Sequence, residues 1–402
     1  MTVEGAQIPL LSERAMLIKG SGIRKAFDLA SEMKDVIHLG LGEPDFEAPE
    51  ELKMLLKVAV DQGFSHYTPN AGFPDLRIVL ADKLNNDNSV KYNPATEVMT
   101  TVGAMNAIQL GILSVINPGD EVIIQDPAFV GFEPCIIMAG GVPVKVPLYE
   151  ENGFRIRPGD ITSRITPRTK MIIINSPHNP TGSVLNQEDL ERIAYIAIKN
   201  NLIVLSDEVY EKLTFDDNNH ISIASLPGMK ERTLTVMSFS KTYCICGWRI
   251  GYAAGPEVLI SNMVKFQQFA AVHPPAPVQK AVLFYLNRSA EFIEHIKRKY
   301  TARRDYMFDR LNGIKDLSCL RPDGAFYVFL NIKKLGCTSE EFSHYLLTNY
   351  RIVTIPGSVM GPSGEGYVRI CLTVPIEQIQ VACMRIEQAV RRIMSEGITG
   401  KS

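Results

Sequence analysis

Several familiar sequence features are missing from this chain, and their absence narrows its function. Its 402 residues carry a net charge of −2, with 42 lysines and arginines against 44 aspartates and glutamates. This balance gives no basic surface field of the kind that recruits nucleic acid or anionic membranes. The apolar runs have the length of strands, far short of a membrane-spanning helix, and the N-terminal residues lack the pattern of a secretory signal. We therefore expect a cytoplasmic protein without nucleic-acid or membrane partners.

Cysteine is scarce as well. The seven cysteines are an odd number in a long chain, which argues against a complete disulfide framework. Cys244 and Cys246 form the closest pair, but no second Cys or His pair with ligand spacing accompanies them. The seven histidines are scattered and contain no HExxH. We predict no metal site and interpret both cysteines as packing residues in a reduced compartment.

Nucleotide-binding motifs are also absent. The segment GLGEPD, which begins at Gly40, has Asp45 where the third glycine of a dinucleotide-binding turn belongs. The terminal GKS lacks both the leading glycine and the following helix of a phosphate-binding P-loop. These departures disfavour a nicotinamide-binding fold and a P-loop enzyme.

The middle of the chain alternates short apolar runs with helical periodicity. Four Ile/Val-rich runs, which begin at Glu121, Lys170, Asn201 and Arg232, are apolar on successive residues and stop at polar residues. Such runs fit strands that are buried on both faces of a largely parallel sheet. Between them, QEDLERIAYIAIKN places Leu190, Ile193, Ala194 and Ala197 on one helical face. The alternation predicts an α/β fold.

The two chain ends have a different pattern. A helical segment over residues 12–33 and a short strand and loop over residues 35–46 come first. A long helical stretch is predicted over about residues 278–311, followed by short strands in GAFYVFLNI, YRIVTIPG and GYVRICLT and by a closing helix over 376–394. We therefore expect a large domain at residues 46–285 and a smaller α+β domain formed by residues 1–45 and 286–402.

Polar clusters follow the strands of the predicted sheet. They are Asp126–Phe129, Asn175–Gly182, Ser206–Tyr210 and Ser238–Lys241. In open α/β sheets, ligands bind outside the carboxyl ends of the strands. A lysine beside hydroxyl groups at a strand end suits Schiff-base chemistry.

With these residues in order, the chain resembles the class I aminotransferases, which are pyridoxal 5'-phosphate enzymes of fold type I. SFSKTYCICGWRIGY resembles the lysine motif of the family, and NSPHNPTG and SDEVY resemble two further motifs, with Arg369 downstream. The similarity runs from GLGEPDF to GYVRI and is nearest to prokaryotic aspartate and aromatic amino acid aminotransferases. It implies a large domain with a mostly parallel seven-stranded sheet flanked by helices, and a smaller α+β domain.

The resemblance gives roles to residues around the cofactor ring. Lys241 would hold the cofactor as a Schiff base and, once freed, move a proton. Asp207 would face the pyridine nitrogen and keep it protonated. Asn179 and Tyr210 would donate hydrogen bonds to the phenolic oxygen, and Phe129 would stack on the ring.

The resemblance also implies a phosphate site and a substrate site. The residues expected around the phosphate are Gly103, Ala104, Met105, Ser238, Ser240 and Arg249, because helix-start N–H groups and an arginine fork bind such a group well. Tyr67 would reach the phosphate of a neighbouring subunit, which implies a homodimer with shared active sites. Arg369, Gly42 and Asn179 would bind the substrate α-carboxylate. No residue is assigned to the substrate side chain.

These implications lead to one main hypothesis and two alternatives. The main hypothesis is an aminotransferase of amino acid metabolism and biosynthesis, with 2-oxoglutarate as acceptor and aspartate or an aromatic amino acid as donor. A carbon–sulfur β-lyase of the same fold needs the same lysine, aspartate and arginines, so the cofactor motifs leave it open. A non-catalytic binding module is the third reading. A mobile N-terminal segment that closes on the substrate is a further hypothesis.

Overall fold

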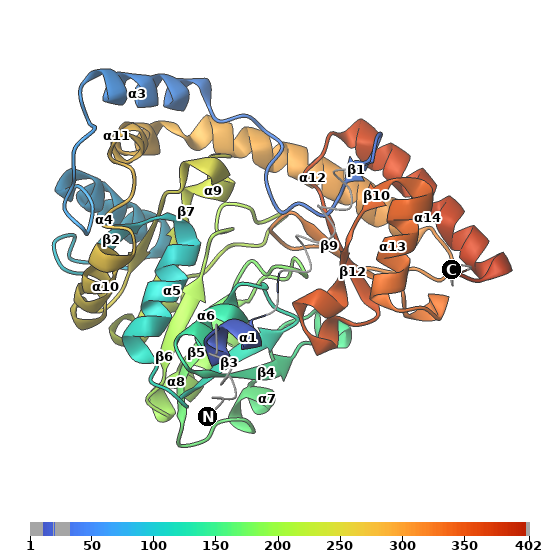
Figure 1. Ribbon diagram of the computed structural model, residues 1–402, viewed down its shortest axis with the longest axis horizontal. Helices are drawn as coiled ribbons and strands as arrows, with labels where there is room; N and C mark the ends of the chain where they lie inside the picture. Colours follow the sequence, from blue (N-terminus) through green and yellow to red (C-terminus); the bar gives the residue numbers. More distant parts are fainter. Residues whose placement is uncertain (1–10, 19, 21–32, 399–402) are drawn as a thin grey trace, which may run out of the picture.

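The computed structural model describes residues 11–18, 20 and 33–398. Figure 1 shows two parts side by side, one built around a large sheet and the other around a small sheet near the C-terminus. The helix α1 (Glu13–Leu17) lies within the predicted N-terminal helical segment, whose residues 19 and 21–32 are outside the described residues. The hypothesis of a closing N-terminal segment falls largely on those residues and stays a prediction, as do the domain boundaries and the cytoplasmic location.

The large sheet has seven strands. They are β2 (Val98–Thr101), β3 (Glu121–Asp126), β4 (Val142–Pro147), β5 (Thr169–Asn175), β6 (Ile203–Asp207), β7 (Thr233–Ser238) and β8 (Gly251–Ala254). Their order is β2-β8-β7-β6-β5-β3-β4; β8 is antiparallel to both of its neighbours, and the other neighbouring pairs are parallel. The four predicted runs coincide with β3, β5, β6 and β7. The α/β fold with a mostly parallel seven-stranded sheet is thus confirmed.

Helices cover both faces of this sheet because alternate strand residues point to opposite sides. Met171 and Ile173 of β5 share a core with α5 (Gly103–Val115), α6 (Phe132–Met138) and α10 (Glu257–Ala270). Ile172 and Ile174 of the same strand share another core with α7 (Pro158–Thr162) and α8 (Gln187–Lys199). At the β2 edge, α3 (Glu50–Asp61), α4 (Pro74–Asn88) and α11 (Ala276–Tyr285) complete the packing.

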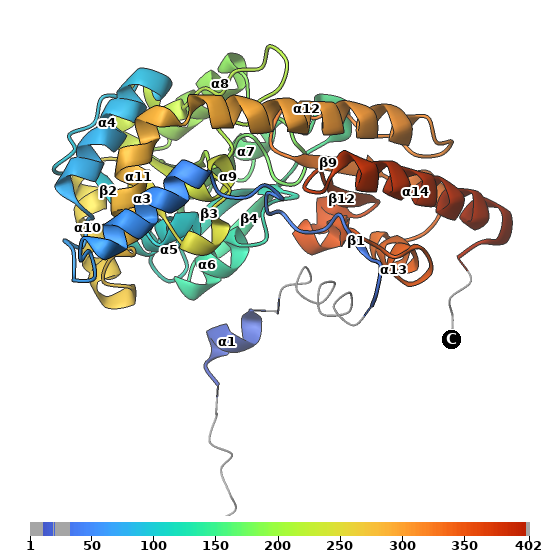
Figure 2. The same ribbon diagram turned by 90° about the horizontal axis from the view of Figure 1, so that it is seen from above.

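The small sheet brings distant parts of the chain together. β9 (Tyr327–Asn331) and β11 (Ile355–Pro356) flank β12 (Tyr367–Cys371) in antiparallel order, and β1 (Ile37–His38) pairs in parallel with β10 (Ile352–Val353). One apolar core joins β1, β9, β10 and β12 to α12 (Ala290–Asn312), α13 (Ser339–Tyr350) and α14 (Ile376–Glu396). Figure 2 shows α12 running from the helices beside the large sheet to the small sheet.

The prediction of one continuous helical stretch over residues 278–311 was wrong, because the structure has two helices there. Helix α11 ends at Tyr285, a 3₁₀ turn covers Leu286–Arg288, and α12 begins at Ala290. The hydroxyl of Ser289 lies 2.9 Å from the Leu286 carbonyl oxygen and 3.1 Å from the Tyr243 hydroxyl. Serine hydroxyls that bond to nearby backbone compete with helix formation in this way. The break therefore has a local cause that apolar periodicity does not reveal.

Across the described residues, no helix combines the length and the apolar composition that crossing a membrane requires.

Candidate active site

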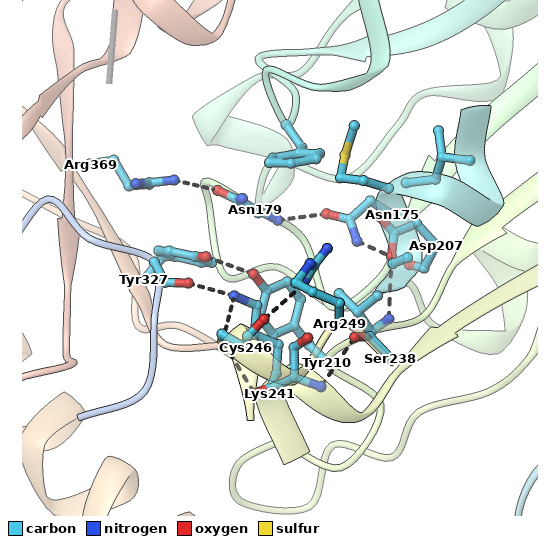
Figure 3. Close-up of a pocket in the computed structure, with 17 residues that line it drawn as sticks. Asn175, Asn179, Asp207, Tyr210, Ser238, Lys241, Cys246, Arg249, Tyr327 and Arg369 are labelled. Atoms are coloured by element: carbon cyan, nitrogen blue, oxygen red, sulfur yellow. Dashed lines mark hydrogen bonds between the residues drawn. The ribbon is translucent and has the colours of Figure 1, made fainter. Parts of the chain in front are cut away.

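A cavity of about 240 Å³ opens where β5, β6 and β7 end. Figure 3 shows Arg369 and Tyr327 on one side of it, and Asp207 and Ser238 on the other. Twelve of the predicted site residues line this cavity: Gly42, Ala104, Met105, Phe129, Asn179, Asp207, Tyr210, Ser238, Ser240, Lys241, Arg249 and Arg369. The structure therefore brings together residues that are more than 300 positions apart in the sequence.

Lys241 lies in a short helix directly after β7. This helix, α9 (Phe239–Thr242), is capped by the Ser238 hydroxyl, which accepts a hydrogen bond from the Ser240 N–H at 3.1 Å. The Lys241 Nζ donates to the Gly42 carbonyl oxygen at 2.6 Å and lies 3.8 Å from Cys246 Sγ. The strand-to-helix turn thus places a primary amine at the cavity, against a backbone segment from the other end of the chain.

Asp207 ends β6 and is held by its neighbours on β5. Asn175 pairs with Asp207 across the two strands and donates from Nδ2 to the Asp207 carbonyl oxygen at 3.0 Å. The Val209 N–H lies 3.3 Å from Asp207 Oδ1. Burial raises the pKa of the Asp207 carboxyl to about 7. No ion pair involves Asp207 within the described residues, so this carboxyl is suited to a protonated ring nitrogen of a ligand.

Two phenols and an amide lie between Asp207 and Arg369. The Tyr210 and Tyr327 hydroxyl oxygens are 2.6 Å apart. Burial raises the pKa of both phenols, so both keep their protons near neutral pH. Asn179 Oδ1 accepts a hydrogen bond from Arg369 Nη1 at 3.0 Å. Tyr210 and the amide nitrogen of Asn179 can therefore act as donors to an anionic ligand oxygen.

The start of α5 and Arg249 form a site for an anion. No side chain caps the first turn of α5, so its N–H groups are available to a ligand. Gly103 has a φ of +74°, and a Cβ there would lie 2.5 Å from Arg249 Nη2. Arg249 also donates from Nη1 to the Cys246 carbonyl oxygen at 2.8 Å. Gly103 does not line the cavity itself; its lack of a side chain lets Arg249 approach the helix start.

Arg369 lies on β12 and is 2% exposed. Its Nη2 donates to the Gly40 carbonyl oxygen at 2.7 Å, and its guanidinium carbon lies 4.7 Å from the centre of the Tyr327 ring. Its Nε is buried and has no hydrogen-bond partner in the described part of the chain. Because a buried charged donor without a partner is costly, this end of the cavity is suited to a ligand carboxylate.

Besides Gly103, Tyr67 is the predicted residue that does not line the cavity. Its side chain is 87% exposed, and its ring meets the His273 ring edge-on at 5.7 Å. Its expected role at a neighbouring subunit's site stays a prediction.

The structure adds residues that the sequence did not single out. Tyr327 and Asn175 line the cavity through the contacts described above, together with Ile108 and Val209. Cys246, interpreted from the sequence as a packing residue, also lines it, and its thiol donates to the Ser240 carbonyl oxygen at 3.3 Å. Asn175 could have been chosen because it opens the motif NSPHNPTG. Tyr327 had no comparable signal, since its position depends on how β9 pairs with β12.

Among the described residues, no three His, Cys, Asp or Glu side chains are grouped so that they could hold a metal ion.

The donors and acceptors present fit pyridoxal 5'-phosphate. The helix start and Arg249 suit the phosphate, the buried carboxyl of Asp207 suits the ring nitrogen, and Lys241 offers the amine. The glycine at 103 lets the Arg249 guanidinium lie against the start of α5. The unpartnered Nε of Arg369 remains for a substrate carboxylate.

Comparisons with known proteins point to one family. Residues 34–386 match the family model of aminotransferases of class I and II. The aspartate aminotransferase of Pyrococcus abyssi is 46% identical over 383 residues, covering 95% of this chain and 98% of that protein. Aromatic-amino-acid aminotransferase 2 of Thermococcus litoralis is 43% identical, with 95% and 98% covered. The crystal structure of an aromatic aminotransferase from Pyrococcus horikoshii superposes with a TM-score of 0.88 at 43% identity, covering 93% of this chain and 100% of that one.

Proposed function

The chain belongs to the aminotransferases of class I and II, and from this membership we propose that it transfers an amino group from aspartate or an aromatic amino acid to 2-oxoglutarate. It is a transaminase of fold type I. The proposed reaction is supported by the placement of Lys241, Asp207 and Arg369 around one cavity. An amine, an acid and a guanidinium at these positions match the needs of amino transfer.

Pyridoxal 5'-phosphate is the cofactor of this family, and when bound it supplies an electron sink for the charge that develops at the substrate α-carbon. We assign the anchoring amine to Lys241 and the contact with the ring nitrogen to Asp207. Asn179 and Tyr210 would donate to the phenolic oxygen, and Phe129 would cover the ring face. The start of α5, Ser238, Ser240 and Arg249 would hold the phosphate.

We assign a separate role in the reaction to each of four residues. The freed Lys241 amine would take a proton from the substrate α-carbon as general base and would then act as general acid in the return of that proton. The Asp207 carboxylate would keep the ring nitrogen of the cofactor protonated. The positive charge on that nitrogen would in turn favour the ionised form of Asp207. Arg369 orients the substrate by binding its α-carboxylate with a planar fork of two donors, and Gly42 lets the backbone come close to the same group.

We also propose that the protein is a homodimer with shared active sites. Tyr67 is 87% exposed, and it contacts His273, which lies just after α10. Phe269, near the end of α10, is 86% exposed. Exposed aromatic side chains are enriched at subunit interfaces. A second copy seated here would cover them and bring its own Tyr67 toward this site.

A donor screen tests the proposed reaction. The purified protein, loaded with cofactor, is incubated with 2-oxoglutarate and single amino acids, and glutamate formation is followed. We expect glutamate with aspartate, phenylalanine or tyrosine. Release of pyruvate and ammonia from cysteine-type substrates without glutamate formation would instead identify a β-lyase. Absence of either reaction would contradict the proposed chemistry.

A further inference from the structure

Tyr327 is a fully buried residue of the cavity for which no role has been assigned so far. It is 1% exposed and begins β9. In the antiparallel pairing of β9 with β12, Phe329 lies opposite Arg369 and Tyr327 lies opposite Cys371. Residues two positions apart on a strand point to the same face. Tyr327 and Arg369 therefore project toward the same side of the small sheet, which is the side of the cavity.

Three contacts join Tyr327 to residues of the proposed site. Its hydroxyl oxygen is 2.6 Å from that of Tyr210. Its ring lies under the Arg369 guanidinium, with 4.7 Å between the guanidinium carbon and the ring centre. A Cβ on Gly42 would lie 2.6 Å from the Tyr327 hydroxyl oxygen. This one side chain thus contacts residues proposed for the cofactor and residues proposed for the substrate carboxylate (Figure 3).

We propose that Tyr327 is a positioning residue that connects the two ends of the site. Its hydroxyl donates to Tyr210 and so tunes the protonation of the cofactor-bound Lys241 nitrogen, while its ring supports the Arg369 guanidinium. This inference rests on the proposed function, because it acts through the cofactor contacts of Tyr210.

The direction of the hydrogen bond follows from proton counting. Both phenols keep their protons, since burial raises the pKa of each. A phenol has one proton to donate and two lone pairs to accept with. When Tyr210 donates its proton to the phenolic oxygen of the cofactor, its own oxygen can only accept from Tyr327. The two phenols then form a chain in which each hydrogen bond strengthens the next.

This chain has a consequence for the Lys241 nitrogen. Negative charge on the phenolic oxygen stabilises a proton on the neighbouring nitrogen. A hydrogen bond to that oxygen disperses the charge and lowers the pKa of the nitrogen. Because Tyr327 strengthens the donation by Tyr210, it lowers that pKa further. The titratable or charged groups around the two phenols come from four elements: Asp207 of β6, Lys241 of α9, Cys246 of the following turn, and Arg369 and Cys371 of β12.

The test is a spectrophotometric pH titration of the cofactor-loaded protein and of its Tyr327→Phe variant. The variant keeps the ring and loses only the hydroxyl. We expect the pKa of the Lys241 nitrogen to rise by about half a unit to one unit, which corresponds to about 0.7 to 1.4 kcal/mol. The KM for the amino donor should stay within about twofold, because the ring under Arg369 remains.

The matched control is Tyr300→Phe. Tyr300 is fully buried, its ring lies 5.4 Å from that of Phe326, and its hydroxyl has no hydrogen-bond partner among the described residues. Like Tyr327→Phe, this substitution removes one buried hydroxyl oxygen next to β9. It therefore controls for any general effect of that loss on packing. The titration of this control should be that of the wild-type protein.

A second variant, Tyr327→Leu, separates the ring from the hydroxyl. It should raise the pKa of the nitrogen as Tyr327→Phe does, and raise the KM about fivefold or more through the lost cation–π contact. In a Tyr210→Phe background, Tyr327→Phe should no longer shift the pKa, because its effect passes through Tyr210.

An unchanged or lowered pKa in Tyr327→Phe would overturn the inference, and so would an undiminished shift in the Tyr210→Phe background. Failure of the proposed function would look different. In that case the wild-type protein would form no glutamate in the donor screen, whereas the titration tests only the role of Tyr327.

Discussion

The two ends of the cavity are built in different ways. At the cofactor end, Asp207 and Ser238 end strands of the large sheet and Lys241 lies in the short helix after β7, so short contiguous motifs supply the groups. At the substrate end, Gly42 and Arg369 come from opposite ends of the chain. The pairing of β12 with β9 brings Arg369 to Tyr327, and the backbone at Gly42 approaches the Tyr327 hydroxyl. The first end is fixed by local structure, and the second by tertiary structure. Substitutions at the two ends should therefore impair the enzyme in different ways.

The largest expected effect is at the cofactor end. Lys241→Ala removes the anchoring amine and the proton carrier together, so turnover should fall by about 10⁴-fold or more. The side chain makes one close hydrogen bond, at 2.6 Å to Gly42, so the fold should survive. Steady-state rates and a thermal melt check both statements. Lys230→Ala, which removes a lysine paired with Glu97 away from the cavity, should keep full activity.

The next prediction concerns Asp207 in the cofactor-free protein. Burial raises its carboxyl pKa to about 7, whereas an unfolded aspartate titrates near 4. The folded state therefore binds the extra proton, and stability should decrease as the pH rises from about 4 to about 7, by at most about 4 kcal/mol. Asp207→Asn should lose this dependence.

Urea unfolding at pH 5 and pH 8 measures the difference. The same slope with pH in the wild-type and Asp207→Asn proteins would show that burial of this carboxyl does not control the stability. Loading the wild-type protein with cofactor should flatten its slope, because a positively charged ring nitrogen lowers the pKa of Asp207.

At the substrate end, Arg369→Lys keeps the charge but loses the fork that binds Asn179 and Gly40. We expect kcat/KM for the amino donor to fall by about 100-fold, mostly through KM, with an unchanged cofactor spectrum. Initial-rate kinetics and absorbance spectra provide the readout. Arg310→Lys, on the exposed face of α12, is the matched control. A loss of cofactor absorbance in Arg369→Lys would contradict the separation of the two ends.

The smallest expected effect tests the packing of Gly42. An alanine there would place its Cβ 2.6 Å from the Tyr327 hydroxyl oxygen and 3.5 Å from the nearest ring carbons. Gly42→Ala should lower kcat/KM by about tenfold, since the overlap must displace one of the two groups. Combining it with Tyr327→Phe removes the overlapping atom and should restore part of the loss.

The control for this prediction is Gly159→Ala, where nothing lies within 4 Å of the added Cβ. The values of kcat/KM of the two single variants and the double variant measure the coupling between Gly42 and Tyr327. Strictly additive losses in Gly42→Ala and Tyr327→Phe would show that the two residues do not constrain each other.

The cofactor end could be predicted from the sequence more fully than the substrate end. The strands β3, β5, β6 and β7 were predictable because each is an apolar run that ends in a polar residue, and the motifs that follow them carry the cofactor end. The family resemblance supplied Arg369 and Gly42. Tyr327 and the pairing of β1 with β10 were not predictable, because strand register across distant segments leaves no local pattern. The break at Ser289 was missed because apolar periodicity does not register the hydrogen bond from the Ser289 hydroxyl to the Leu286 carbonyl oxygen.

The bond between Lys241 and the cofactor is the central assignment in this active site. Borohydride reduction of the loaded protein, followed by proteolysis and mass spectrometry, locates the lysine that carries the reduced cofactor. We predict that the label lies on Lys241, within the segment SFSKTYCICGWR. A label on another lysine, or a loaded protein that takes up no label, would contradict the assignment of this cavity as the active site.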